Sequence, residues 1–190
     1  MAVQQAIHIP PQSASTARYD RVTICLHWLS ALLVIALFAA AYIWNDLPKG
    51  TPLRKSLQSL HISLGILFTV VFLVRLFWRT SRGRKLASTE TGIVRILSKS
   101  VHHVLYLLLA AQVLLGYLLR WAQGEPFMFF GLFSIPAAFA PDKALAGWFE
   151  WLHNYAAWTI IILAFGHAVA ALTHHYWLRD NVLKRMLPVG

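Results

Sequence analysis

Six of the nine histidines in this chain lie inside long apolar segments or near their first residues: His27, His61, His102, His103, His153 and His167. Two more, His174 and His175, lie at the end of the last segment. An imidazole is costly inside a lipid bilayer, and ionisable groups that occur there usually have a function. A neutral imidazole nitrogen is also among the commonest metal ligands in proteins. The residue types therefore suggest metal or cofactor binding. The question is how the apolar segments place these side chains.

The composition is typical of an integral membrane protein. Of the 190 residues, 58% are hydrophobic and 13% are charged, and the mean hydropathy is +0.57. Soluble domains carry about 25% charged residues. Four apolar stretches are long enough to span a bilayer, at about residues 24–44, 58–79, 101–121 and 153–177. Since a backbone in lipid must satisfy its own hydrogen bonds, we expect an all-α four-helix bundle over residues 19–188, after a flexible tail at residues 1–18.

Positive charge is distributed unequally between the connections. The net charge is +10. Because the cations lie between apolar segments, we expect them to set the topology and meet lipid headgroups rather than bind nucleic acid. One side carries Arg18, Arg21, Arg79, Arg82, Arg84, Lys85, Arg95, Lys99, Arg179, Lys184 and Arg185. The other side carries Lys49, Arg54, Lys55, Arg120 and Lys143, offset by Asp46, Glu125, Asp142 and Glu150. The positive-inside rule then places both termini in the cytoplasm, with Arg75 snorkelling to the same surface. The first twenty residues lack an apolar core, so we expect no signal peptide there.

The histidines fall at two depths. His27 lies near the cytoplasmic end of the first segment, and His61 near the outer end of the second. His153 and His167 are fourteen residues apart in the last segment. On a helix this spacing separates them by about 21 Å and returns them to within about 40° of the same face. The last helix would thus present one imidazole at each level, toward His27 at the inner level and His61 at the outer level.

Two histidine pairs stacked across a four-helix bundle suit two b-type haems. Each iron takes an axial imidazole from two facing helices. We therefore expect two haem b groups, one held by His27 and His167 and the other by His61 and His153. A tetrahedral zinc or copper site fits less well, because it needs three or four ligands at one level.

Small residues lie beside several of these positions. Gly65 follows His61 by one turn, Gly166 precedes His167, and Gly116 is in the middle of the third segment. Glycines would allow the close approach of a flat ring, although they also serve ordinary helix packing.

The same residues occur in motifs of a known family. The motifs are RYDRVTICLHWLSALLV, LHISLGI, HHVLY, GEPFMFFGLFSIP, WLHNYAAW and GHAVAALTHHYWLRDNVLKRMLP. With them, residues 18–188 resemble the bacterial cytochrome b561 family of four-helix, di-haem cytochromes of the inner membrane. The resemblance implies the same two ligand pairs. It also implies electron transfer to the quinone pool of a respiratory chain.

Two functions follow from the resemblance. Some members are similar to superoxide oxidases, so the leading hypothesis is an oxidoreductase that transfers electrons from superoxide to ubiquinone. The alternative is a di-haem subunit docked to a partner dehydrogenase or hydrogenase as protein electron donor. A transporter is disfavoured because no acidic residue lies in mid-membrane. The sequence assigns no oligomeric state.

Three cations of the first outer connection could steer superoxide, which is a small anion: Lys49, Arg54 and Lys55. The alternative is that they are solvated loop residues without a specific role. His174, seven residues after His167, could hydrogen-bond a quinone carbonyl and relay protons, or could be an ordinary interfacial histidine. His102 could bind a quinone or a haem propionate.

The longest connection contains the aromatic run PFMFFGLFSIPAAFA at residues 126–140. We expect it to lie on the outer membrane surface as a short interfacial helix, or as a lid over a reaction site. Cys25 is the only cysteine, which excludes a disulfide within the chain, and we assign it a packing role.

Overall fold

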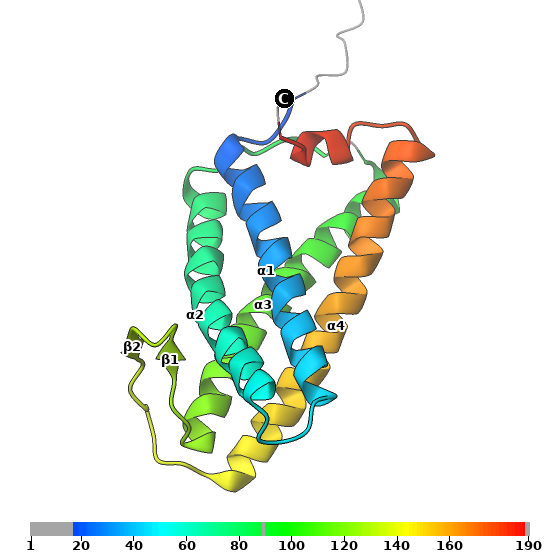
Figure 1. The fold of residues 1–190 in the computed structure, drawn as a ribbon. Coiled ribbons are helices and arrows are strands. Elements are labelled where there is room, and N and C mark those ends of the chain that lie inside the picture. Colours follow the sequence, from blue (N-terminus) through cyan, green and yellow to red (C-terminus); the bar gives the residue numbers. More distant parts are fainter. Residues whose placement is uncertain (1–16, 89, 189–190) are drawn as a thin grey trace, which may run out of the picture.

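The computed structural model describes residues 17–88 and 90–188, which form four long helices arranged as two pairs (Figure 1). Helix α1 (Arg21–Asn45) packs against α2 (Pro52–Ser81), and α3 (Gly92–Gln123) packs against α4 (Lys143–Tyr176). All four are long and apolar enough to cross a membrane. The predicted all-α, four-helix membrane fold is confirmed. The predicted tail at residues 1–18 falls almost wholly outside the described residues.

The helices extend beyond the predicted spans. Helix α4 begins at Lys143 rather than near residue 153, because the Asp142 carboxylate caps it by accepting from the amides of Ala144 (2.8 Å) and Leu145 (3.0 Å). Helix α2 begins at Pro52, so Arg54 and Lys55 belong to its first turn and not to the preceding loop. Hydropathy predicts only the apolar part of a helix that lies in lipid, so the predicted spans leave out these polar extensions.

The connection between α3 and α4 holds a small antiparallel hairpin, β1 (Met128–Phe129) and β2 (Phe133–Ser134). The prediction of a short interfacial helix here is wrong. Phe130 (φ 45°) and Gly131 (φ 74°) both adopt positive φ, and the Leu132 amide donates to the Phe129 carbonyl at 2.8 Å. Two successive residues with positive φ form the tight turn that suits the twist of paired strands.

The hairpin is fastened to α2. The hydroxyl of Ser63, which is fully buried, accepts a hydrogen bond from the Phe130 amide at 2.9 Å. Phe127, just before β1, is also buried. The hairpin therefore lies alongside α2, near the end of that helix that carries His61 (Figure 1).

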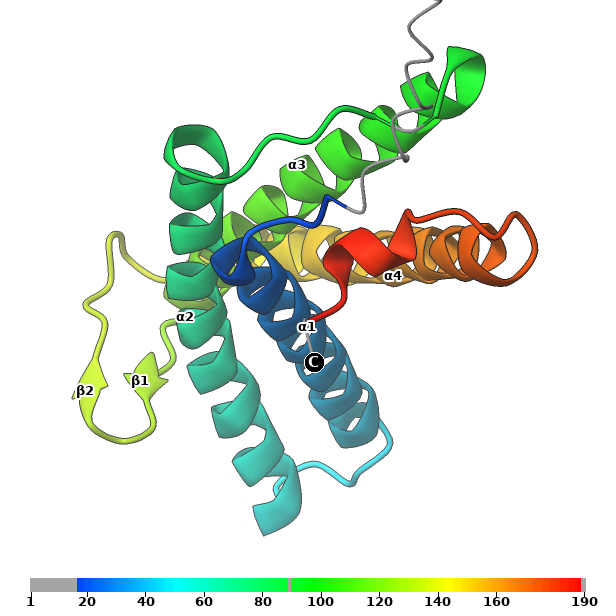
Figure 2. The ribbon, with the colours of Figure 1, turned by 90° about the horizontal axis from the view of Figure 1, so that it is seen from above.

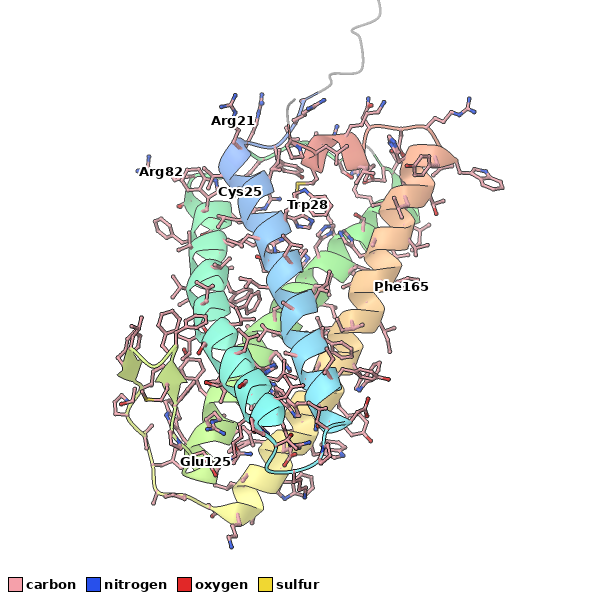
Figure 3. The ribbon with its side chains drawn as sticks, viewed as in Figure 1. Arg21, Cys25, Trp28, Arg82, Glu125 and Phe165 are labelled. Carbon is pink, nitrogen blue, oxygen red and sulfur yellow. The ribbon has the colours of Figure 1, made fainter. Side chains whose placement is uncertain are left out.

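The apolar core lies mainly between α1, α2 and α3. Its buried residues are Leu33, Phe68, Val71 and Phe72, with Tyr106, Leu109 and Val113 of α3 packed against them. Many large apolar side chains point outward instead. Phe165 of α4, for example, is 71% exposed and projects away from the bundle (Figure 3). An apolar exterior is expected where helices face lipid.

A short 3-10 helix, η1 (Leu183–Met186), closes one end of the bundle and lies between the start of α1 and α4 (Figure 2). The Trp28 indole N–H donates to the Met186 carbonyl at 2.8 Å, and the Tyr19 amide donates to the Arg185 carbonyl at 3.1 Å. Figure 3 shows Arg21 and Arg82 at this end and Glu125 at the opposite end. Both ends of the described chain therefore lie on the same, arginine-rich side.

Asp20 organises this end of the molecule. Its carboxylate accepts from the amide (2.8 Å) and hydroxyl (2.7 Å) of Thr23, from the Trp78 indole (2.9 Å) and from the Arg84 amide (2.9 Å). Partial burial alone would raise the pKa of this carboxyl, but the hydrogen bonds outweigh it and hold the pKa well below its ordinary value of 3.8. One side chain thus joins the start of α1 to the end of α2.

We expect Asp20→Asn to lower the thermal stability of the detergent-solubilised protein at pH 7. Hydrogen bonds to a charged acceptor are worth about 1.5–3 kcal/mol, and the new amide group donates where the carboxylate accepted. Because the folded pKa is depressed, this stabilisation is present above the ordinary value of 3.8 and is lost as the pH falls below it. Thermal unfolding measured at stepwise lower pH should show a smaller acid dependence in the variant. The control is Asp46→Asn at the other end of α1, and an equal loss of stability in both variants would contradict the assigned role.

Candidate cofactor sites

Near the end of the bundle that holds both ends of the described chain, which is the predicted inner level, α1 and α4 bring His27 and His167 together. Their ring centroids are 6.4 Å apart and the ring planes are inclined by 70°. Both side chains are half-buried. His102 of α3 joins them, with its ring centroid 5.0 Å from that of His167.

Near the opposite end, which is the predicted outer level, α2 and α4 bring His61 and His153 together in nearly the same geometry. The centroids are 6.3 Å apart and the planes are again inclined by 70°. The Trp44 ring packs edge-on against His61, with centroids 4.9 Å apart. The structure therefore brings together the histidines that the sequence pairs by depth, with α4 contributing one to each level.

The spacing of both pairs suits two imidazoles on one metal ion. Two metal–nitrogen bonds of about 2 Å, with about 1 Å from each nitrogen to its ring centre, span about 6 Å. The Nδ1 atom of His61 lies 2.8 Å from the Leu37 carbonyl, to which it can donate, and this leaves Nε2 as the ligand nitrogen. The Nδ1 atom of His153 is buried and makes no hydrogen bond of normal geometry. In their spacing, both pairs therefore fit a group that takes one imidazole from each side, and at the outer pair the free ring nitrogens fit it as well.

Of the three glycines noted in the sequence, Gly116 makes the tightest approach. A Cβ atom there would lie 3.4 Å from Cε1 of His153. At Gly65 and Gly166 a Cβ atom would meet nothing within 4 Å. Gly116 of α3 thus sets the space available to the His153 ring, whereas the other two glycines face open space.

Residues 17–88 and 90–188 contain no group of three or more His, Cys, Asp or Glu side chains placed to hold a metal ion. The neighbouring His102 and His103 each point Nδ1 at a carbonyl in the preceding turn, at 2.6 Å to Ser98 and 2.8 Å to Lys99. Cys25, for which the sequence predicts only a packing role, is exposed near the inner end of α1 (Figure 3).

Arg75 does not snorkel to the surface, contrary to the prediction. Its Nη2 atom lies 3.0 Å from Nδ1 of His27, and its guanidinium carbon lies 5.2 Å from the centroid of the Tyr106 ring. The side chain therefore crosses the bundle from α2 toward α1 and α3. Residue spacing along the chain does not predict this contact, because it depends on how α1 packs against α2.

His174, at the end of α4, pairs with a residue that sequence reasoning missed. Its Nδ1 atom hydrogen-bonds the carboxylate of Asp180, which follows the helix. Partial burial would raise the pKa of Asp180, but hydrogen bonds from His174 and the Val182 amide, with the charges of His174 and Arg185, lower it instead. Asp180 is therefore a carboxylate at neutral pH, aimed at the His174 ring.

The three cations expected to act together at the outer side differ in their surroundings. Lys49 and Lys55 are exposed. Arg54 is half-buried, and its Nη1 atom donates to the carbonyls of Trp44 (2.5 Å) and Leu47 (2.9 Å) at the end of α1. Arg54 thus joins α1 to α2, and the two lysines are the cations of this set that face solvent.

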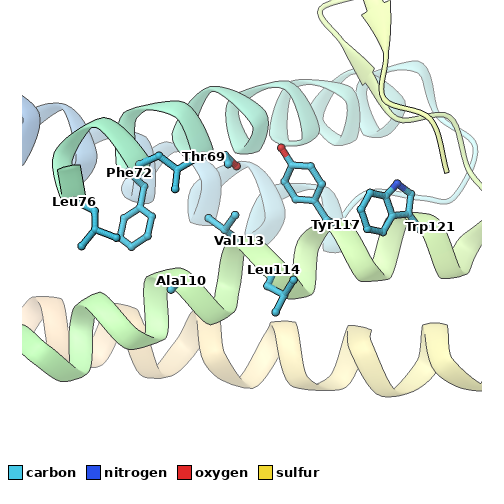
Figure 4. A pocket seen from close by; sticks show the side chains of 9 residues that line it. Thr69, Phe72, Leu76, Ala110, Val113, Leu114, Tyr117 and Trp121 are labelled. Atoms are coloured by element: carbon cyan, nitrogen blue, oxygen red, sulfur yellow. The ribbon is translucent and has the colours of Figure 1, made fainter. Parts of the chain in front are cut away.

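A cavity of about 360 Å³ lies between α2 and α3 (Figure 4). Its walls are mainly apolar: Thr69, Phe72, Leu73, Leu76, Ala110, Val113, Leu114, Tyr117 and Trp121. No histidine contributes to this lining, so it is separate from the two histidine pairs.

A bundle of four membrane-crossing helices with facing histidines at two depths is the architecture of a membrane b-type cytochrome. The family model described as prokaryotic cytochrome b561 matches residues 18–189. The chain belongs to this family, whose proteins transfer electrons in membranes and whose cofactor is b-type haem.

Curated relatives match along almost their whole length. "Cytochrome b561 homolog 2" of Escherichia coli (strain K12) is 34% identical, over 90% of this chain and 91% of its own. "Probable superoxide oxidase CybB" of Yersinia pestis is 28% identical, over 90% and 96% respectively. "Cytochrome b562" of Cereibacter sphaeroides is 28% identical, over 89% and 94%.

We expect Gly116→Val to disturb the outer level, because the branched side chain would enter the space of the His153 ring. Haem b per chain, measured by pyridine haemochromogen absorbance, should fall by about one. Gly147→Val in α4 is the matched control, because a Cβ atom there meets nothing within 4 Å. Equal haem content in the two variants would show that Gly116 has no part in the site.

Proposed function

We propose that this protein is a di-haem cytochrome b of the bacterial inner membrane that oxidises superoxide and reduces ubiquinone. The observation that carries the proposal is the pair of facing imidazoles at each of two depths, 6.4 Å and 6.3 Å between centroids. His27 and His167 would hold one haem, and His61 and His153 the other. Bound there, the haems would supply one-electron transfer across the membrane.

The overall reaction balances with two superoxide anions for each quinone. Each superoxide loses one electron and becomes O₂, and ubiquinone takes up two electrons and two protons to become ubiquinol. The relative from Yersinia pestis that is named a probable superoxide oxidase supports this choice of substrate. The reaction needs attraction for a small anion on one side and a proton source beside the quinone.

On the side opposite the termini, superoxide would be attracted by three cations: Lys49, Arg54 and Lys55. The two lysines are exposed, so their field reaches solvent, while Arg54 also fastens α1 to α2. Fixed positive charge raises the local concentration of an anionic substrate and its association rate. Placing this side outside the cytoplasm agrees with the larger number of cations around the termini.

His174 and Asp180 would supply the proton at the quinone. When His174 is protonated, Nδ1–H donates to the Asp180 carboxylate and Nε2–H is left to donate to a quinone carbonyl. Transfer of the Nε2 proton leaves a neutral ring that still donates from Nδ1, so Asp180 fixes its orientation throughout. His102, which contacts His167, is a second polar group at this level and could bind the quinone or a haem propionate.

The alternative function, a subunit docked to a dehydrogenase or hydrogenase, is favoured by one feature. The hairpin exposes Leu132 (77%), Phe133 (52%) and Phe130 (49%), which could form a docking surface for a protein donor. Such a subunit would react slowly with superoxide, and added salt would not alter the rate.

Single histidine substitutions test the proposed pairs. His61→Ala and His153→Ala should each leave about one haem per chain with the same residual low-temperature spectrum. His27→Ala and His167→Ala should leave a different residual spectrum, also shared within the pair. His103→Ala, at an exposed position of α3, should retain both haems. Loss of both haems from every variant, or residual spectra that match across the pairs, would contradict the assignment.

Charge removal tests the substrate. In Lys49→Gln/Lys55→Gln we expect the rate of superoxide consumption with a water-soluble quinone to fall several-fold at low salt and to lose most of its salt dependence. Lys85→Gln/Lys99→Gln removes the same charge from exposed positions on the other side and should have little effect. If wild-type protein consumes superoxide slowly and without salt dependence, the docked-subunit function takes the place of the first.

A further inference from the structure

Arg75 is a cation inside the bundle at the depth of the inner histidine pair. It is half-buried and lies on α2, within a helix that is apolar enough to cross the membrane. Its two contacts are Nδ1 of His27, 3.0 Å from Nη2, and the face of the Tyr106 ring. The ion pair described within residues 17–88 and 90–188 joins His174 to Asp180 and does not involve Arg75.

An arginine in this position needs more hydrogen-bond acceptors than these two contacts supply. A charged side chain within a membrane is costly, and it usually pairs with another polar group. A ring face and one imidazole nitrogen compensate a guanidinium only in part, because five N–H donors need acceptors. The structure therefore leaves Arg75 with donors to spare beside His27.

The contact with His27 is also incompatible with metal binding by a neutral His27 ring. Guanidinium groups only donate, so Nδ1 of His27 accepts. A neutral imidazole that accepts at Nδ1 carries its hydrogen on Nε2, and a nitrogen that carries hydrogen has no lone pair for a metal. If His27 holds iron, Arg75 must give up this nitrogen and find another acceptor nearby.

We propose that Arg75 is the counter-cation of the inner haem: with haem bound it leaves His27, pairs with a haem carboxylate, and raises the reduction potential of the inner haem. The proposal rests on the ligand pairs proposed above. The planar guanidinium matches a carboxylate with two parallel hydrogen bonds. Because reduction adds one electron to the haem, a nearby fixed positive charge favours the reduced form.

The outer level differs in this respect. His61 points Nδ1 at the neutral Leu37 carbonyl at 2.8 Å. In the described part of the chain no lysine or arginine hydrogen-bonds His61 or His153. Two half-buried arginines at that end have other partners: Arg54 bonds backbone carbonyls, and Arg120 bonds the Gln123 side chain and the Pro126 carbonyl. The effect of Arg75 should therefore be confined to the inner haem, and a higher potential there favours electron flow toward the quinone side.

The test is a redox titration of the purified holoprotein, followed by absorbance, for wild type, Arg75→Gln, Arg75→Lys and Arg79→Gln. Arg75→Gln should shift the ferric–ferrous equilibrium of one haem at least tenfold toward the ferric form, which is about 59 mV for one electron, and leave the other haem unchanged. Arg75→Lys keeps the positive charge, so its inner haem should have a reduction potential close to that of the wild type. Arg79→Gln removes an arginine one turn away, whose guanidinium lies over Tyr19 and bonds the Arg84 carbonyl, and should shift neither haem by as much. The residual spectra of the histidine variants identify which haem moved.

Several results would overturn the proposal: an unchanged inner potential in Arg75→Gln, equal shifts of both haems, a lysine variant no better than the glutamine variant, or a wild type that lacks the inner haem. If Arg75→Gln loses the inner haem, the outcome depends on Arg75→Lys. An inner haem retained in Arg75→Lys with a near-wild-type potential would support the role of the charge, and loss of the inner haem from both variants would refute it. Superoxide consumption is measured separately. A protein that shows the Arg75 shift but no superoxide activity would refute the proposed substrate and leave the counter-cation in place.

Discussion

The cost of an imidazole inside a bilayer is the constraint on which the rest of the structure depends. An intramembrane histidine needs a polar partner. His27, His61, His153 and His167 contact a histidine of another helix in this bundle, whereas His102 and His103 also bond carbonyls of their own helix. Helix α4 supplies His153 to one level and His167 to the other, so it must face α2 at the outer end and α1 at the inner end. Two metal ions held between these pairs would join α4 to the α1–α2 pair at two heights.

The protein's own packing is consistent with that arrangement. The apolar core joins α1, α2 and α3, whereas the only buried residue recorded on α4 is Ile160. At the inner end, hydrogen bonds fasten both ends of the described chain. Asp20 bonds Trp78 and Arg84 at the end of α2, and η1 accepts a hydrogen bond from Trp28 of α1. At the outer end, Arg54 of α2 bonds the Trp44 carbonyl of α1, and the hairpin is bonded to Ser63 of α2.

Much of this could be predicted from the sequence, because the membrane makes its pattern simple. Four apolar stretches predict the helices, and the fourteen-residue spacing of His153 and His167 predicts one face at two depths. The hairpin could not be predicted in this way, since an aromatic run beside Gly131 suits a surface helix as well as a turn. Likewise Arg75 and Asp180 find His27 and His174 through tertiary packing, which no periodicity along the chain encodes.

The central claim is that the chain holds two haem groups between two histidine pairs. The most direct measurement is haem b per chain in the purified, folded wild-type protein, by pyridine haemochromogen absorbance. The account predicts a value near two. A value near one would remove one of the pairs from the site, and a value near zero in folded protein would contradict the account altogether.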